Sequence, residues 1–142
     1  MGSLNHIATV SLVSMLTFGT AVPFVQPAIA QQAPARLTGA FVGVDHPTKG
    51  NAYVINKSGK SYLVLDKAFQ SHEGPDLFVL LHRSGVPETY TEQNYVSLGR
   101  LQNVNGPQWY EIPSGVNPTD YKSVVVWCRE FNVTFGYAPF KS

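Results

Sequence analysis

Beyond residue 36, the apolar residues of this chain come in short runs, and clusters rich in Gly, Pro, Asn or Asp separate the runs. The two most apolar runs are Leu77 to His82 and Ser123 to Cys128. Runs of about five to eight residues suit β-strands and are too short to show a helical period. We therefore predict an all-β fold, an antiparallel β-sandwich or a flattened barrel, with about eight or nine short strands.

The predicted strands are Leu37 to Val44, Ala52 to Asn56, Ser61 to Leu65, Leu77 to His82, Tyr95 to Leu101, Gln108 to Ile112, Ser123 to Cys128 and Phe131 to Phe135. Arg83 to Asn94 and Pro113 to Asp120 are polar and contain Gly and Pro, which predicts surface loops. Asp66 to Gln70 is the one segment in which we expect a helical turn. A chain of 142 residues gives one domain with one core.

Residues 1–30 have the pattern of an export signal. The stretch from Ile7 to Val25 is apolar or small, and Ala28 and Ala30 satisfy the small-x-small rule for signal peptidase. We predict cleavage after Ala30, which leaves residues 31–36 as a flexible leader and residues 37–142 as the β domain. The protein would then be periplasmic or extracellular.

A membrane anchor is the alternative interpretation of this segment. No Lys or Arg precedes the apolar stretch, which is unusual for a signal peptide. Thr9, Ser11, Ser14 and Pro23 nevertheless make it a poor permanent span, because a span needs about 20 strongly apolar residues. We expect no permanent membrane span after signal cleavage.

The charge of the chain excludes one class of partner. Charged residues make up 13% of the sequence, the formal net charge is +1, and no basic block occurs. A protein that binds nucleic acid normally carries a clustered positive surface, so we expect no nucleic-acid partner.

Cys128 is the only cysteine, so the chain can form neither an intramolecular disulfide nor a Cys-rich zinc site. Strand alternation places Val124, Val126 and Cys128 on one face and Val125 and Trp127 on the other. Cys128 is the one candidate for chemistry, as a redox thiol or a soft ligand. The alternative is an inert thiol in the core, where free cysteines are common.

Three histidines follow the predicted signal, and two are candidate ligands. His46 and His72 lie in turn clusters, where ligands are often displayed but where polar residues also occur by default. His82 ends an apolar strand, so we interpret it as structural. The spacing of the histidines does not indicate a preformed metal site, and we predict no metal ligands.

Two other groups of residues have both a functional and a structural interpretation. Asp76 in Gly74-Pro75-Asp76 could bind a cation, but a turn in which it caps backbone N–H groups is favoured. Aromatic side chains could form a ligand platform, but core packing is favoured. These aromatic residues are Trp109, Tyr110, Tyr121 and Trp127. With no nucleophile elbow, a stand-alone enzyme is not favoured.

Ordered sequence blocks extend from Gly39 to about Phe140. They are Gly39-x-Phe41, His46-x-Thr48-x-Gly50, Leu65 with Phe69, GPDLFVLL from Gly74 to Leu81, Leu98-Gly99-x-Leu101, Gly106-Pro107-Gln108-x-Tyr110-x-Ile112-Pro113, Tyr121-x-SVVVWC ending at Cys128, and Phe131-x-Val133-x-Phe135-Gly136-x-Ala138. In this order the blocks resemble the DM-thirteen domain family, a small extracytoplasmic β domain that often accompanies DOMON domains. The GPDL and SVVVWC blocks are the specific ones.

This resemblance implies a sandwich-like fold and a redox or electron-transfer role centred on Cys128. The thiol would act directly or hold a prosthetic group such as haem, with His46 and His72 as further candidate ligands. The partner would be a redox or cell-surface protein. A non-catalytic binding or scaffold domain with a structural cysteine remains the alternative, and its loops would face the partner.

Overall fold

The computed structural model of this chain describes residues 36–141, together with residues 19, 21 and 23. The predicted signal peptide and most of the predicted leader lie outside the described residues, so export stays a prediction. Within the described part, no helix has both the length and the apolar character that a membrane crossing requires.

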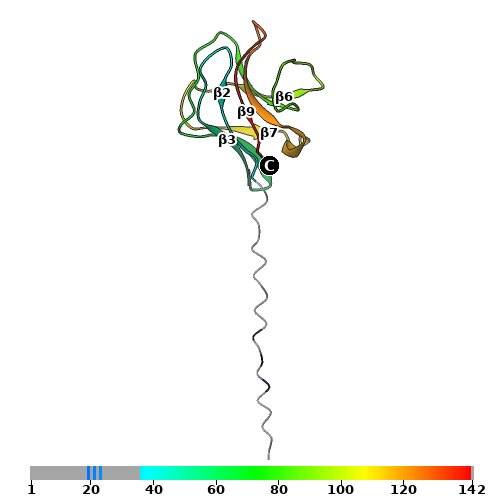
Figure 1. Cartoon of the computed structure of the whole chain (residues 1–142). Helices are drawn as coiled ribbons and strands as arrows, with labels where there is room; N and C mark the ends of the chain where they lie inside the picture. The colour runs from blue at the N-terminus through cyan, green and yellow to red at the C-terminus, as the bar shows by residue number, and fades with distance from the viewer. Residues whose placement is uncertain (1–18, 20, 22, 24–35, 142) are drawn as a thin grey trace, which may run out of the picture. The chain divides into compact units, whose positions relative to one another are not determined.

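The domain consists of two antiparallel sheets in two layers (Figure 1). The four-stranded sheet has the order β1 (Thr38–Ala40), β3 (Asn51–Lys57), β4 (Lys60–Leu65) and β7 (Gln108–Ile112). The five-stranded sheet has the order β2 (Val42–Gly43), β9 (Val133–Pro139), β8 (Ser123–Cys128), β5 (Leu77–His82) and β6 (Tyr95–Arg100). The predicted all-β sandwich is confirmed, and the sheets do not close into a barrel.

The first predicted strand, Leu37 to Val44, is wrong as a single strand. Its two halves belong to different sheets, because β1 pairs with β3 and β2 pairs with β9. Phe41 lies between them with its side chain buried in the core. Its backbone N–H donates to Gly50 O at 2.9 Å, which fixes the crossing point. The segment of residues 38–43 therefore passes from the four-stranded sheet to the five-stranded sheet.

The last predicted strand is displaced along the sequence. It was expected over Phe131 to Phe135, whereas β9 covers Val133–Pro139. Arg129 to Asn132 form the tight turn from β8, with Asn132 N–H donating to Arg129 O at 3.2 Å. Asn132 has a φ of 49°, which asparagine tolerates better than most residues.

Among the described residues, helical structure is limited to the 3₁₀ turn η1 (Pro118–Asp120). The helical turn expected over Asp66 to Gln70 is only a hydrogen-bonded turn, in which Phe69 N–H donates to Asp66 O. Gln70 instead forms paired backbone hydrogen bonds with Lys49, each 2.9 Å. This link joins two loops at one end of the sandwich.

Apolar side chains fill the space between the sheets and also cover part of the outer face of the five-stranded sheet. As predicted for β8, Val124, Val126 and Cys128 face the inner core. Val125 and Trp127 belong to the outer cluster. This arrangement places the sulfur between the two layers.

The loop from Arg83 to Asn94 lies against that outer cluster. The ring of Tyr90 stacks on Trp127 at 4.8 Å between centroids. The loop is closed by a 2.8 Å hydrogen bond from Arg83 N–H to Asn94 O. His82 supports the loop, with Nε2 2.8 Å from Thr89 O and Nδ1 accepting from Ser84 N–H, as expected of a structural histidine.

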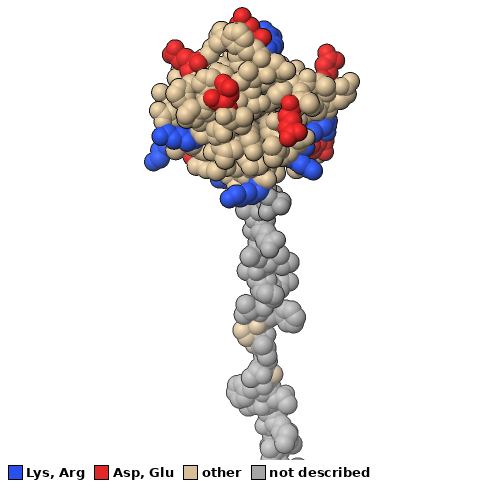
Figure 2. Space-filling model, turned by 45° about the horizontal axis from the view of Figure 1, so that its top comes forward, with Lys and Arg blue, Asp and Glu red and all other residues tan. Residues whose placement is uncertain are grey.

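The two ends of the described domain lie side by side at the lower edge of the fold in Figure 1. A hydrogen bond joins them, in which Lys141 N–H donates to Thr38 O at 2.8 Å. Charged side chains are scattered over the face shown in Figure 2, with wide uncharged areas between them. That surface agrees with the low charge content of the sequence.

Candidate functional site

Cys128 is the last residue of β8 and is completely buried, at 0% exposure. Its neighbours across the sheet are Leu77 on β5 and Val133 on β9. Side chains directly opposite each other on antiparallel strands are in contact range, so these two apolar residues flank the thiol. Solvent does not reach the sulfur in this conformation.

An ion-pair network joins the GPDL block to the end of the SVVVWC block, the two most specific blocks of the sequence. Arg129 follows Cys128, and its Nε lies 2.9 Å from Asp76 Oδ2, while Arg100 Nη1 lies 3.1 Å from Asp76 Oδ1. The main chain adds a bond from Arg129 N–H to Asp76 O at 3.0 Å. The expected turn is present at Pro75 and Asp76, but the Asp76 carboxylate binds two arginines instead of capping backbone N–H groups.

The side chain of Arg129 does not turn toward the thiol. Its guanidinium lies 4.5 Å above the ring of Phe78, which packs with the outer cluster, whereas Cys128 faces the inner core. The charge of Arg129 is therefore directed to Asp76 and away from the sulfur.

His46 is held rigidly at one end of the sandwich. Its ring stacks on Phe135 with 3.8 Å between centroids and 23° between planes. Its buried Nδ1 lies 2.8 Å from Asp45 Oδ2, a close contact that does not have the geometry of a hydrogen bond. Thr48 Oγ1 donates to His46 O at 3.2 Å. These contacts fix both the backbone and the ring.

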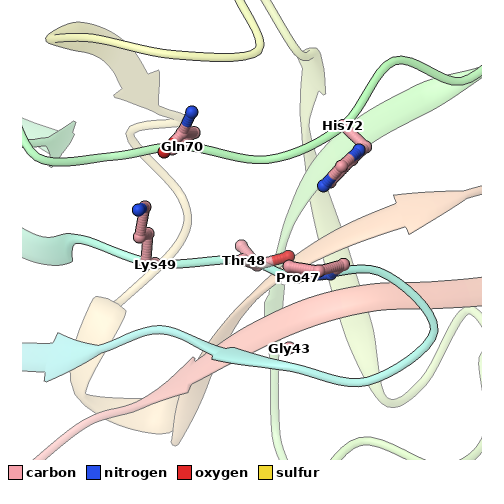
Figure 3. Close-up of a pocket in the computed structure, with 6 residues that line it drawn as sticks. All are labelled: Gly43, Pro47, Thr48, Lys49, Gln70 and His72. Carbon is pink, nitrogen blue, oxygen red and sulfur yellow. The ribbon is translucent and has the colours of Figure 1, made fainter.

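The structure brings the two candidate histidines together. The ring centroids of His46 and His72 are 5.6 Å apart, with 44° between the planes. His72 lines a cavity of about 320 Å³, with Pro47, Thr48, Lys49, Gln70 and Gly43. In Figure 3 its imidazole points toward Pro47 and Thr48, while Lys49 and Gln70 lie at the other end.

A second cavity, of about 340 Å³, opens beside His46. The apolar side chains of Phe131, Val133 and Phe135 line it, together with Asp45, Glu73, Gly74 and Pro75. Val133 is also the strand neighbour of Cys128. We refer to Val133 and Phe135, the two β9 residues that line this cavity, as the wall; Val133 neighbours the thiol on β8, and Phe135 stacks with His46.

The arrangement does not fit a haem bound through Cys128. The sulfur has no exposed surface and lines neither of the two cavities, so an iron atom could reach it only if the core repacked. Within the described residues, no group of three or more His, Cys, Asp and Glu side chains could hold a metal ion. We derive no step through haem.

The family assignment follows from a match over most of the domain. Residues 40–140 match the family model described as Electron transfer DM13. The chain belongs to the electron transfer DM13 family. The matched region begins at the end of β1 and extends past β9. Comparisons with curated proteins and with solved structures gave no significant match.

Sequence reasoning missed several residues of this DM13 site. Phe131, Val133 and Phe135 were predicted only as strand residues, yet they form the cavity beside His46. Asp45 was not predicted as a site residue, although an acidic residue next to a histidine is a visible signal for a close polar contact. No local pattern pairs His46 with His72, because 26 positions separate them in the sequence (72 minus 46).

The aromatic residues of the DM13 domain mostly follow the expectation of core packing. Tyr110, Tyr121 and Trp127 are buried, whereas Trp109 is exposed on the outer face of the four-stranded sheet. Trp109 packs against Tyr62 there, with 5.6 Å between ring centroids. These positions do not converge on one ligand platform.

Proposed function

We propose that this DM13 protein is an exported electron-transfer domain and that the Cys128 thiol is its redox group. The family supports an electron-transfer role. The observation that supports the assignment to Cys128 is its position, since its strand neighbour Val133 also lines the cavity beside His46, whose ring lies next to that of His72. Cys128 and His46 are thus each next to one residue of the wall.

The chemistry of a lone thiol limits how it can carry electrons. Because the chain has one cysteine, oxidation to a disulfide needs a second sulfur from a partner protein. The Cys128 thiolate would attack a partner disulfide, form a new S–S bond and release the other partner sulfur as a thiolate. The thiol proton passes to solvent, and the leaving sulfur takes up the electron pair of the broken bond. This route requires Val133 and Phe135 to move aside.

A scaffold function is the second candidate, and one specific observation favours it. Cys128 is 0% exposed among apolar side chains, as an inert core thiol would be. In that case the domain would bind a partner through its surface, and the sulfur would only fill space. The two candidates differ in what removal of the sulfur does to electron uptake.

Redox titration of the purified protein with soluble mediators separates the two candidates. We expect the wild type to exchange electrons with a disulfide mediator and Cys128→Ala to lose this activity. The control is Val126→Ala, which removes apolar volume from the same inner face of β8 but keeps the thiol. Electron exchange that is absent in the wild type or unchanged in Cys128→Ala would refute the thiol assignment.

Export has its own test. We expect the chain to accumulate outside the cytoplasm with Gln31 as its first residue, because cleavage follows the Ala28-x-Ala30 pattern. Intact-mass measurement of the fractionated protein gives this terminus directly. A chain that keeps residues 1–30 and stays in the cytoplasm would show that the export part of the proposal is wrong.

A further inference from the structure

We propose that His46 and His72 together bind one copper(II) ion, with Asp45 as the residue that orients His46. This site lies outside the core and does not include Cys128. Copper binding stands on geometry alone, and only its role in carrying electrons rests on the proposed function. The site is formed by two loops, around residues 43–49 and 70–73, that the paired hydrogen bonds between Lys49 and Gln70 hold together.

The spacing of the two rings suits a shared ion. With a metal–nitrogen bond of about 2.0 Å, an ion lies about 3.2 Å from each imidazole centroid, so two imidazoles on one ion have centroids about 4.5 to 6.4 Å apart. The observed separation of His46 and His72 is 5.6 Å. This separation lies inside that range, as two ligands of one ion require.

His46 has the surroundings of a metal ligand. Ligating histidines usually direct their second ring nitrogen at a carboxylate or carbonyl, which fixes the tautomer and makes the ligating nitrogen more basic. Asp45 Oδ2 lies 2.8 Å from His46 Nδ1, close to this arrangement although without the geometry of a hydrogen bond, and Nε2 is then the nitrogen for the ion. The stack on Phe135 fixes the ring plane. The His46 side chain therefore loses little conformational freedom when the copper ion binds.

The donor set favours copper over other common ions. Imidazole suits late first-row metals, and for a given set of nitrogen and oxygen donors Cu²⁺ binds tightest in the divalent series. Water would complete the coordination, and the carboxylates of Asp45 and Glu73 line the cavity next to His46 and provide negative charge. When Cu²⁺ accepts one electron from a donor it becomes Cu⁺, so the ion would give this end of the domain a one-electron couple.

Titration of the purified protein with copper(II) chloride tests the site. Calorimetry should give one ion per chain, and electron paramagnetic resonance should show coupling to two nitrogens. For a chain that keeps residues 1–30, the titrations use a His6→Ala background, which removes the histidine outside the described residues. We expect His46→Gln and His72→Gln each to weaken binding at least about tenfold, and Asp45→Asn to weaken it by about 10- to 100-fold.

Two controls keep the result interpretable. Glu111→Gln removes a carboxylate that lines neither of the two cavities, and it should bind copper like the parent. Cys128→Ala should also bind like the parent, so loss of the thiol redox activity and loss of copper binding are separate outcomes. Thermal melts without copper show whether each variant is folded. Equal copper affinity of the parent and His72→Gln would mean adventitious surface binding and would overturn the proposal.

Discussion

Asp76 lies where the start of β5 meets the end of β8, and its removal should cost more stability than any solvent-exposed ion pair does. Its side chain is 13% exposed and contacts Arg129 Nε at 2.9 Å and Arg100 Nη1 at 3.1 Å. Both guanidinium groups also lie over the ring of Phe78, at 4.5 and 5.0 Å. The Asp76→Ala variant leaves two adjacent positive charges without their counterion.

The magnitude lies between two limits. Removing one partner of a fully buried ion pair costs about 3–5 kcal/mol, whereas exposed pairs contribute about 0–1 kcal/mol. The carboxylate of Asp76 is nearly buried, but Arg129 and Arg100 are 56% and 63% exposed, so water can solvate both cations after the change. We therefore expect Asp76→Ala to lower the free energy of unfolding by about 1–2 kcal/mol.

Urea unfolding followed by tryptophan fluorescence measures this loss, with an unchanged m-value as evidence that only stability has changed. Glu111→Gln is the matched control, since it breaks the exposed pair that Lys60 Nζ and Glu111 Oε1 form at 3.1 Å. The control should unfold at the wild-type urea midpoint. If Asp76→Ala unfolds at the same midpoint as Glu111→Gln, the network does not join β5 to β8 in the way described.

Three further predictions concern buried polar and titratable groups. Ser71→Ala should raise the free energy of unfolding by about 1 kcal/mol in urea melts, because the Ser71 hydroxyl is buried without a hydrogen-bond partner; a loss would contradict this. Burial raises the pKa of Tyr110 to about 12, while a tyrosine in the unfolded chain ionises near about pH 10. The stability that this shift contributes is complete below about pH 10 and is lost as the pH rises through about 12. Tyr110→Phe should therefore make the loss of stability with rising pH less steep than in the wild type. Identical stability profiles of the two proteins between about pH 9 and 12 would refute this prediction. Cys128→Ser should be less stable than Cys128→Ala by about 1–3 kcal/mol in thermal or urea melts, because a hydroxyl would be buried without a partner, and the reverse order would mean that the sulfur site is polar.

Sequence reasoning succeeded where local pattern determines structure. The period of two in β8 correctly placed Val124, Val126 and Cys128 on the core face, because strand alternation does not depend on distant residues. It failed at Phe41, where an apparently continuous run crosses from one sheet to the other. Which partner each half of the run selects is decided by β3 and β9, and no pattern within the run encodes that choice.

The candidate site was predictable only in its individual members. His46 and His72 were each recognised as turn residues that could display a ligand, but their contact depends on the link between Lys49 and Gln70. That link is a tertiary contact between two loops and leaves no spacing signal in the sequence. The burial of Cys128 was foreseen from its alignment with valines, whereas the wall of Val133 and Phe135 could be seen only in three dimensions.

The accessibility of the Cys128 sulfur is the most direct test of the redox assignment. Labelling of the folded protein with a small disulfide reagent, as a function of urea, gives the free energy of the opening that exposes the thiol. We predict a value well below the free energy of global unfolding, with faster labelling in Val133→Ala, because a local movement of the wall is enough. If the two free energies are equal, the thiol is reached only through global unfolding, and the redox role of Cys128 is contradicted.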